Sequence, residues 1–201
     1  MQKNLYGGKF IVFEGLDGSG QSTQVKLLTE YFEKQGREVF LTKEPTKTTQ
    51  AGKKIQSVLN EKKKIKPLQL QELFAQDRQE HLEKEIIPAL KKGKIVISDR
   101  YFFSTLAFGG LNVPVAKLEK INDDFLYPDK IFFLKVAPTE CVRRIIKRGE
   151  GVKFFEKLDK LKKVDNNYSQ ICLRFPDVEI INGQEKIGEI HRRIRSFFNN
   201  K

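Results

Sequence analysis

The chain has 201 residues, with 38 lysines and arginines against 26 acidic residues and a formal net charge of +12. Its length is compatible with one α/β domain over residues 1–201. No apolar run approaches the ~20 residues that cross a bilayer, and the first residues lack the apolar core of a signal peptide. We therefore expect a cytoplasmic protein that does not bind membranes. The charge fits a nucleic-acid surface or the handling of small anions, but the lysine runs lack the interleaved aromatic residues of a stacking platform, so no nucleic-acid partner is expected.

Short apolar segments alternate with longer stretches of helical periodicity. The expected strands are Phe10–Phe13, Glu38–Leu41, Ile95–Ser98, Ile131–Val136 and Val178–Ile181. The expected helices are Ser22–Gln35, Ala51–Leu59, Leu68–Lys92, Val115–Phe125, Pro138–Lys147, Phe154–Leu173 and Gln184–Phe198. This alternation predicts an α/β fold with three layers, in which helices cover both faces of a five-stranded parallel sheet.

A glycine-rich loop follows the first expected strand. It fits the phosphate-binding pattern G-x-x-x-x-G-K-[ST] at every position but one, because Gln21 stands where the pattern has lysine. An ordinary strand-turn-helix corner is the alternative, and the dinucleotide pattern G-x-G-x-x-G fails because its third glycine is missing. The loop predicts a P-loop NTPase-type fold that binds ATP through backbone N–H groups. The expected ATP-binding residues are Gly15, Asp17, Gly18, Ser19, Gly20, Gln21, Ser22 and Thr23.

Polar residues also follow the second and third expected strands, where ligands of parallel sheets gather. Asp99 is placed to hold Mg²⁺ together with Ser22, or else to cap a helix. Arg100 could hold two phosphate oxygens or form a surface salt bridge. Lys43 could add a second cation from the neighbouring strand.

Two further patterns allow both a functional and a structural interpretation. Phe74 and Arg78 are four residues apart and share a helix face, which suits a nucleobase but also suits a core ring beside a surface arginine. The basic stretch around Gly149 and Gly151 predicts a mobile lid or a charged helix pair with a glycine turn.

The cysteines and histidines show no metal-binding or redox spacing. We expect Cys141 and Cys172 to be free thiols within helices. We expect His81 and His191 to be solvated or to cap helices.

Several motifs together resemble the thymidylate kinases, the P-loop enzymes that phosphorylate dTMP with ATP. They are Phe13-Glu-Gly-Leu-Asp-Gly-Ser-Gly20, Thr42-Lys-Glu-Pro-Thr46, Glu72-Leu-Phe-Ala-Gln-Asp-Arg-Gln-Glu-His81, Val96-Ile-Ser-Asp-Arg-Tyr-Phe-Phe-Ser-Thr-Leu-Ala107 and Lys163-Val-Asp-Asn-Asn-Tyr168. The resemblance covers most of the chain. It implies a homodimer, ATP and dTMP as substrates, Mg²⁺ as cofactor, and a lid over about residues 143–156.

The resemblance also implies a role for each matching residue. Asp17 would approach the monophosphate and the metal, and Arg100 would hold the dTMP phosphate. Lys43 would stand where the family usually has a phosphate-binding arginine, and Arg148 would be a lid residue near ATP. The residues implied to contact the base or sugar are Phe74 by stacking, Arg78 by bonding the base oxygen, Ser104 and Thr105 along the base edge, and Phe108.

Four positions depart from the family pattern: Gln21, Lys43, Phe108 in place of a common tyrosine, and Gly109 in place of a frequent glutamine. The expected reaction is transfer of the γ-phosphoryl group of ATP to dTMP, with Asp17, Arg100 and Arg148 as catalytic residues. The alternative is a kinase-like nucleotide sensor with little or no transfer, because glutamine lacks the charge of the loop lysine. The sequence leaves open whether dUMP or another monophosphate is accepted.

Overall fold

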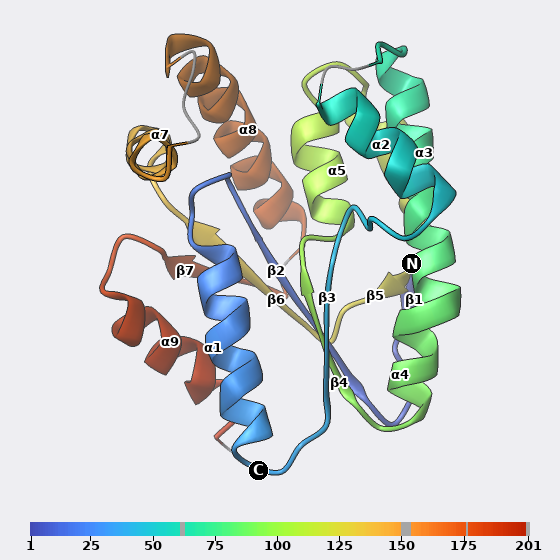
Figure 1. Cartoon of the computed structure of the whole chain (residues 1–201), viewed down its shortest axis with the longest axis vertical. Helices are drawn as coiled ribbons and strands as arrows, with labels where there is room; N and C mark the ends of the chain where they lie inside the picture. The colour runs from blue at the N-terminus through green and yellow to red at the C-terminus, as the bar shows by residue number, and fades with distance from the viewer. Residues whose placement is uncertain (61–62, 150–153, 176, 200–201) are drawn as a thin grey trace.

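The computed structural model describes residues 1–60, 63–149, 154–175 and 177–199, with backbone alone over 154–157 (Figure 1). Its main sheet has five parallel strands in the order β3-β4-β2-β6-β7. The strands are β2 (Lys9–Gly15), β3 (Val39–Lys43), β4 (Ile95–Asp99), β6 (Lys130–Lys135) and β7 (Val178–Asn182). The predicted α/β fold with a five-stranded parallel sheet is therefore confirmed.

Successive side chains of a strand point to opposite faces of the sheet, so each face carries apolar residues that helices cover. In β2, Ile11 and Phe13 pack with α1 (Gln21–Glu33) and α9 (Ile187–Ser196) in one core. On the other face Phe10 and Val12 belong to a larger core. The helices of this second core are α3 (Pro67–His81), α4 (Ile87–Lys91), α5 (Phe102–Gly109), α6 (Val115–Asn122), α7 (Pro138–Lys147) and α8 (Phe154–Arg174).

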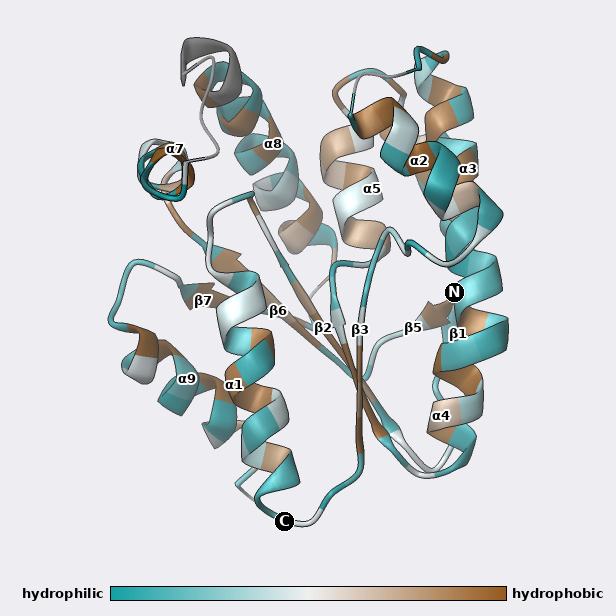
Figure 2. Ribbon diagram, in the orientation of Figure 1, coloured by the Kyte–Doolittle hydropathy of each residue, from teal (hydrophilic) through white to brown (hydrophobic). Residues whose placement is uncertain are grey.

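Hydropathy follows this layering. Figure 2 shows hydrophobic residues concentrated along the strands, whereas α3 carries many hydrophilic ones. Beyond the carboxyl ends of the strands, α2 (Gln50–Leu59), α5, α7 and α8 rise above the sheet (Figure 1). Among the described residues, no helix combines the length and the hydropathy needed to cross a bilayer.

Three regions differ from the expected elements. The long helix expected over Leu68–Lys92 contains a π-helical turn, Leu82–Ile86, between α3 and α4. Pro88 lacks an N–H and its ring clashes with the carbonyl four residues earlier, which accounts for a break in the regular ladder here. Helix α5 was not expected, because its sequence is almost uniformly apolar and carries no helical periodicity. A two-residue pair, β1 (Gln2–Lys3) with β5 (Leu126–Tyr127), is too short to predict.

Candidate active site

The glycine-rich loop joins β2 to α1 and carries its glycines where the backbone needs them. Gly18 and Gly20 have φ angles of 88° and 99°, a region that side chains disfavour. A Cβ at Gly18 would also lie 2.6 Å from the carbonyl oxygen of Cys141 on α7. Because α1 begins at Gln21, the positive end of its dipole faces the loop, which is suited to an anion.

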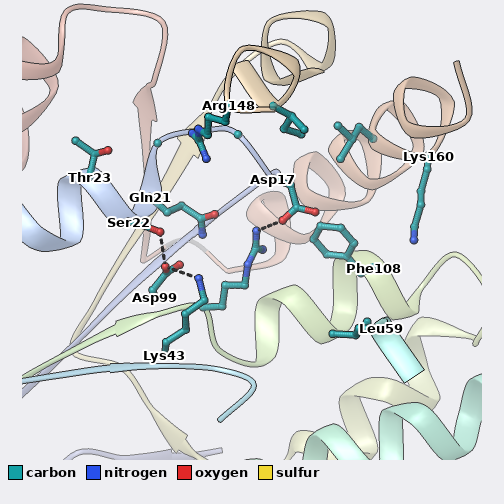
Figure 3. Close-up of a pocket in the computed structure, with 15 residues that line it drawn as sticks. Asp17, Gln21, Ser22, Thr23, Lys43, Leu59, Asp99, Phe108, Arg148 and Lys160 are labelled. Carbon is teal, nitrogen blue, oxygen red and sulfur yellow. Dashed lines mark hydrogen bonds and ion pairs between the residues drawn. The ribbon is translucent and has the colours of Figure 1, made fainter. Parts of the chain in front are cut away.

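A cavity of about 680 Å³ opens at this loop, and we call it the loop cavity (Figure 3). It is lined by Asp17, Gly18, Gly20, Gln21, Ser22, Thr23, Lys43, Leu59, Asp99, Arg100, Phe108, Ile145, Arg148, Lys160 and Leu161. Of the residues expected to bind ATP, Gly15 and Ser19 lie outside this lining. Ser19 is buried, and its hydroxyl has no hydrogen-bond partner among the described residues.

Gln21 is turned towards the sheet. Its Nε2 donates a hydrogen bond of 3.2 Å to the carbonyl oxygen of Phe13 on β2, and the residue is only 5% exposed. The amide therefore satisfies a carbonyl at the end of the strand and brings no charge to the loop cavity.

Three polar side chains from different elements meet beside the loop. Asp99 Oδ2 accepts a hydrogen bond of 2.7 Å from Ser22 Oγ and lies 2.9 Å from Lys43 Nζ. The sheet fixes this meeting, because Lys43 and Asp99 are register partners at the ends of β3 and β4. Figure 3 shows both side chains converging on the Asp99 carboxylate.

The pair of Ser22 and Asp99 fits Mg²⁺. A hydroxyl and a carboxylate are the hard oxygen ligands that this ion prefers, and it commonly takes its remaining ligands from phosphates and water. Across the described ranges of the chain, no group of three or more His, Cys, Asp or Glu residues could hold a metal by itself. The expected metal residues are thus brought together by the fold.

Arg100 occupies the centre of the site with an unusual backbone. It is the one residue other than glycine in the described chain with a positive φ, 79°, which costs about 1–2 kcal/mol. Its guanidinium donates to the Gly15 carbonyl at 2.9 Å, to Ser104 Oγ at 3.0 Å and to Asp17 Oδ1 at 2.8 Å. Burial opposes the charge, but nearby acidic groups, foremost Asp17, raise the pKa of Arg100 above its ordinary value.

Glu14 is a buried carboxylate that the sequence analysis did not single out. It accepts hydrogen bonds from the N–H of Tyr101 at 2.8 Å, from Ser104 Oγ at 2.6 Å and from the Tyr168 hydroxyl at 2.8 Å. Burial raises the pKa of Glu14, while Arg100 and these donors act in the opposite direction. Glu14 therefore fixes α5 and α8 against the end of β2. A charged residue inside an apolar strand was the available signal.

A second cavity of about 340 Å³ adjoins the first, and we call it the apolar cavity. Phe74, Arg78, Ser104, Thr105 and Phe108, the residues expected around a base or sugar, all line it. Its other lining residues are Asp17, Glu44, Pro45, Leu59, Ile65, Pro67, Leu70, Gln71, Arg100, Tyr101, Leu111, Asn112 and Lys160. Arg100, Asp17 and Phe108 line both cavities. Lys43 is not among the described residues that line the apolar cavity.

Arg78 is not a surface arginine, because it is 1% exposed. Its Nε donates to Glu44 Oε2 at 2.8 Å, its Nη2 donates to Thr105 Oγ1 at 3.2 Å, and its Nη1 donates to Asn122. The guanidinium also lies 5.1 Å from the centre of the Tyr101 ring. These contacts orient a planar donor at the wall of the apolar cavity.

His81 corrects the sequence analysis, which expected a solvated or capping histidine. It is 1% exposed, and its Nδ1 lies 3.2 Å from Glu44 Oε1 while its Nε2 lies 2.7 Å from Thr42 Oγ1. Its position one helical turn after Arg78 places both side chains on the helix face that meets the end of β3. His81 and Arg78 thus hold the two oxygens of one buried carboxylate.

The family model for thymidylate kinase matches residues 13–194. The chain belongs to the thymidylate kinase family. It is 41% identical over 193 residues to a probable thymidylate kinase of Pyrococcus horikoshii, covering 93% of this chain and 94% of that protein. A thymidylate kinase of Desulfotalea psychrophila is 38% identical over 189 residues, covering 93% of this chain and 92% of the relative. The resemblance drawn from the motifs is confirmed.

Membership of the thymidylate kinase family makes the departure at Gly109 informative. A Cβ at this position would lie 2.7 Å from Oε1 of Gln71, a buried residue that lines the apolar cavity. The space that a longer side chain at position 109 would need is therefore taken by a glutamine from α3.

The expected lid over 143–156 is described only in part, since residues 150–153 lie outside the described residues. Arg148, at the C-cap of α7, lines the loop cavity (Figure 3). Arg144, one of the basic residues in the stretch expected to form the lid, donates to the carbonyls of Ser19 at 3.2 Å and Gly183 at 3.1 Å. It ties α7 to the glycine-rich loop, and the density of basic residues in this stretch was its only sequence signal.

Proposed function

We propose that this member of the thymidylate kinase family transfers the γ-phosphoryl group of ATP to the phosphate of dTMP, giving ADP and dTDP. One observation carries the proposal: Arg100 lies where a phosphate-loop cavity meets an apolar cavity lined by Phe74 and Arg78. A phosphate held by Arg100 would have its nucleoside on one side and the triphosphate on the other.

On the donor side, backbone N–H groups of residues 18–22 would surround the ATP phosphates at the start of α1. Ser22 and Asp99 would hold Mg²⁺, which when bound neutralises phosphate charge and aligns the phosphates. Arg148 at the end of α7 would bring a lid cation to the same cavity. Its place in the cavity lining supports this role.

On the acceptor side, Phe74 would stack on thymine and Arg78 would donate to a base oxygen. Ser104 and Thr105 would lie along the base edge, and Phe108 near the sugar. The buried, fully oriented guanidinium of Arg78 supports discrimination by hydrogen bonding, because a base without a matching acceptor would leave a buried donor unpaired.

The chemical step requires no nucleophilic side chain. An oxygen of the dTMP phosphate forms a bond to the γ-phosphorus as the bond from that phosphorus to the bridging oxygen breaks, and ADP leaves with the electron pair. The chain aligns the two phosphates and balances their charge, with Arg100 on the acceptor and Asp17 orienting Arg100 at 2.8 Å.

The test is dTMP-dependent ADP release by the purified protein with MgATP. A thermal-shift panel with dTMP, dUMP, AMP and CMP accompanies it, since a ligand that binds only the folded state raises the melting temperature according to its affinity. We expect dTMP to give the largest shift and to trigger ADP release. A larger shift with AMP or CMP would reassign the acceptor.

A nucleotide sensor with little transfer is the second candidate, and the neutral, engaged side chain of Gln21 favours it. Loss of one preorganised donor typically costs about 2.7–4 kcal/mol in the transition state. Both candidates bind ATP and dTMP. Tight binding of both nucleotides without dTMP-dependent ADP release would support the sensor.

A further inference from the structure

The phosphate loop lacks one positive charge. In the loop pattern a lysine reaches the terminal phosphates, and here that position is Gln21, whose Nε2 donates to Phe13 O at 3.2 Å. A neutral amide that is already hydrogen-bonded to the strand does not offset the charge of a triphosphate. A kinase with this loop needs a cation from another element.

Lys43 places an ammonium group beside the loop from the neighbouring strand. Its Nζ lies 2.9 Å from Asp99 Oδ2, the same oxygen that accepts the hydrogen bond from Ser22 at 2.7 Å. Ser22 follows Gln21 directly, so the ammonium and the expected lysine position share one corner of the loop cavity. Figure 3 shows Lys43, Ser22 and Gln21 around Asp99.

Lys43 is also able to exchange its partner. Its side chain is 59% exposed, and an ion pair at such exposure contributes about 0–1 kcal/mol, so a phosphate oxygen can replace the Asp99 carboxylate. Arg100 lacks this freedom, because its side chain is 14% exposed and is held by Asp17, Ser104 and the Gly15 carbonyl.

The cavity assignment separates a donor role from an acceptor role for Lys43. Lys43 lines the loop cavity, whereas the base-contacting candidates Phe74 and Arg78 line the apolar cavity. Arg100, in contrast, lines both cavities and is the bridging cation for the acceptor phosphate. Lys43 thus lies on the glycine-rich-loop side of the site, where the ATP phosphates are placed, and shares Asp99 Oδ2 with Ser22.

We propose that Lys43 supplies the ammonium that Gln21 lacks and contacts the terminal phosphates of ATP during transfer. The inference deepens the proposed function and rests on it. The backbone amides of the loop and the Lys43 ammonium would then bind the phosphates together, with the cation supplied by the end of β3 instead of the first residue of α1.

An exchange of the two side chains tests the proposal. The variants are Lys43→Gln, Gln21→Lys and the double variant Gln21→Lys/Lys43→Gln, with Lys43→Arg as the charge-preserving change. Lys47→Gln is the matched control, because Lys47 is exposed in the segment that follows β3 and is absent from both cavity linings. Steady-state rates are measured at varied dTMP and MgATP, and calorimetry measures binding of ADP and of a non-hydrolysable ATP analogue with Mg²⁺.

For Lys43→Gln we expect kcat to fall about 100- to 1000-fold, as for loss of one preorganised donor, with little change in KM for dTMP. The ATP analogue should lose more affinity than ADP, because the ammonium contacts the terminal phosphate. The double variant should recover kcat to within about tenfold of the natural protein. Lys43→Arg should lose less kcat than Lys43→Gln because it keeps the charge, and Lys47→Gln should stay close to the natural protein.

Two results would overturn the proposal. One is a raised KM for dTMP with unchanged kcat in Lys43→Gln, which would return Lys43 to the acceptor phosphate. The other is a double variant that folds, by its melting temperature, but stays as slow as Lys43→Gln. A natural protein without dTMP-dependent ADP release would contradict the proposed function instead, and the binding comparison of the analogue with ADP would still decide the role of Lys43.

Discussion

The two cavities of the site are built on different principles. At the loop cavity, the stretch from Asp17 to Thr23 supplies backbone and polar side chains, and residues of other elements, among them Lys43 and Asp99, complete the lining. The apolar cavity depends on a buried network in which Glu44, the α3 residues Arg78 and His81, and Thr105 come from three distant places in the chain. A side-chain change such as Gln21 leaves the backbone amides of the loop in place, and a cation from another element can offset it, whereas buried charges depend on one another.

The largest expected effect is in the buried network. Arg78→Ala removes the cation of the Glu44 carboxylate and leaves that charge buried, with His81 as its remaining side-chain partner among the described residues. We expect a loss of about 3–5 kcal/mol in the free energy of unfolding, together with loss of dTMP binding. Urea denaturation measures the first and calorimetry the second. Gln76→Ala, at an exposed position of the same helix, is the control, and a loss below about 1 kcal/mol for Arg78→Ala would contradict the network.

A smaller effect is expected from His81→Leu. Glu44 Oε1 would lose its imidazole donor, which costs about 1–3 kcal/mol for a buried acceptor left unpaired. Because Glu44 orients Arg78, we expect KM for dTMP to rise while KM for MgATP stays unchanged. His191→Leu, on α9 and away from both cavities, is the comparison. Equal changes in both KM values would assign His81 a general structural role.

Gly18→Ala is expected to distort the glycine-rich loop that lines the loop cavity. The left-handed backbone at this position costs a side chain about 1–2 kcal/mol, and the new Cβ would press on the Cys141 carbonyl at 2.6 Å. We expect MgADP binding to weaken at least tenfold while dTMP binding is retained. Gly36→Ala separates the two causes, since Gly36 has a φ of 72° but no atom within 4 Å of its Cβ. Equal nucleotide affinities in the two variants would show that the contact with α7 is unimportant.

The smallest effect concerns the thiols. Burial raises the pKa of Cys141 to about 12 and that of Cys172 to about 11. A raised pKa lowers the thiolate fraction, so alkylation of the folded protein should be slow at pH 8 and should rise about tenfold per pH unit below the pKa. Labelling in urea should be fast at both positions. Fast labelling of Cys141 in the folded protein would mean that α7 separates from the loop.

The sequence by itself predicted the parts of the site that local patterns encode. The glycine-rich loop, the alternation of strands and helices, and the polar ends of the strands predicted the sheet and the meeting of Ser22, Asp99 and Lys43. These features depend on short-range spacing and on the rule that parallel strands end at one edge. They were therefore accessible without coordinates.

Other features required the tertiary structure. Glu14, Glu44 and His81 become polar anchors only because α3, α5 and α8 close over the ends of β2 and β3. Helix α5 is surrounded by the core, so its sequence lacks the polar face that marks an amphipathic helix. Sequence thus determined the fold and the kind of ligand, while three-dimensional packing decided which buried charges pair, because pairing depends on distances between segments far apart in the chain.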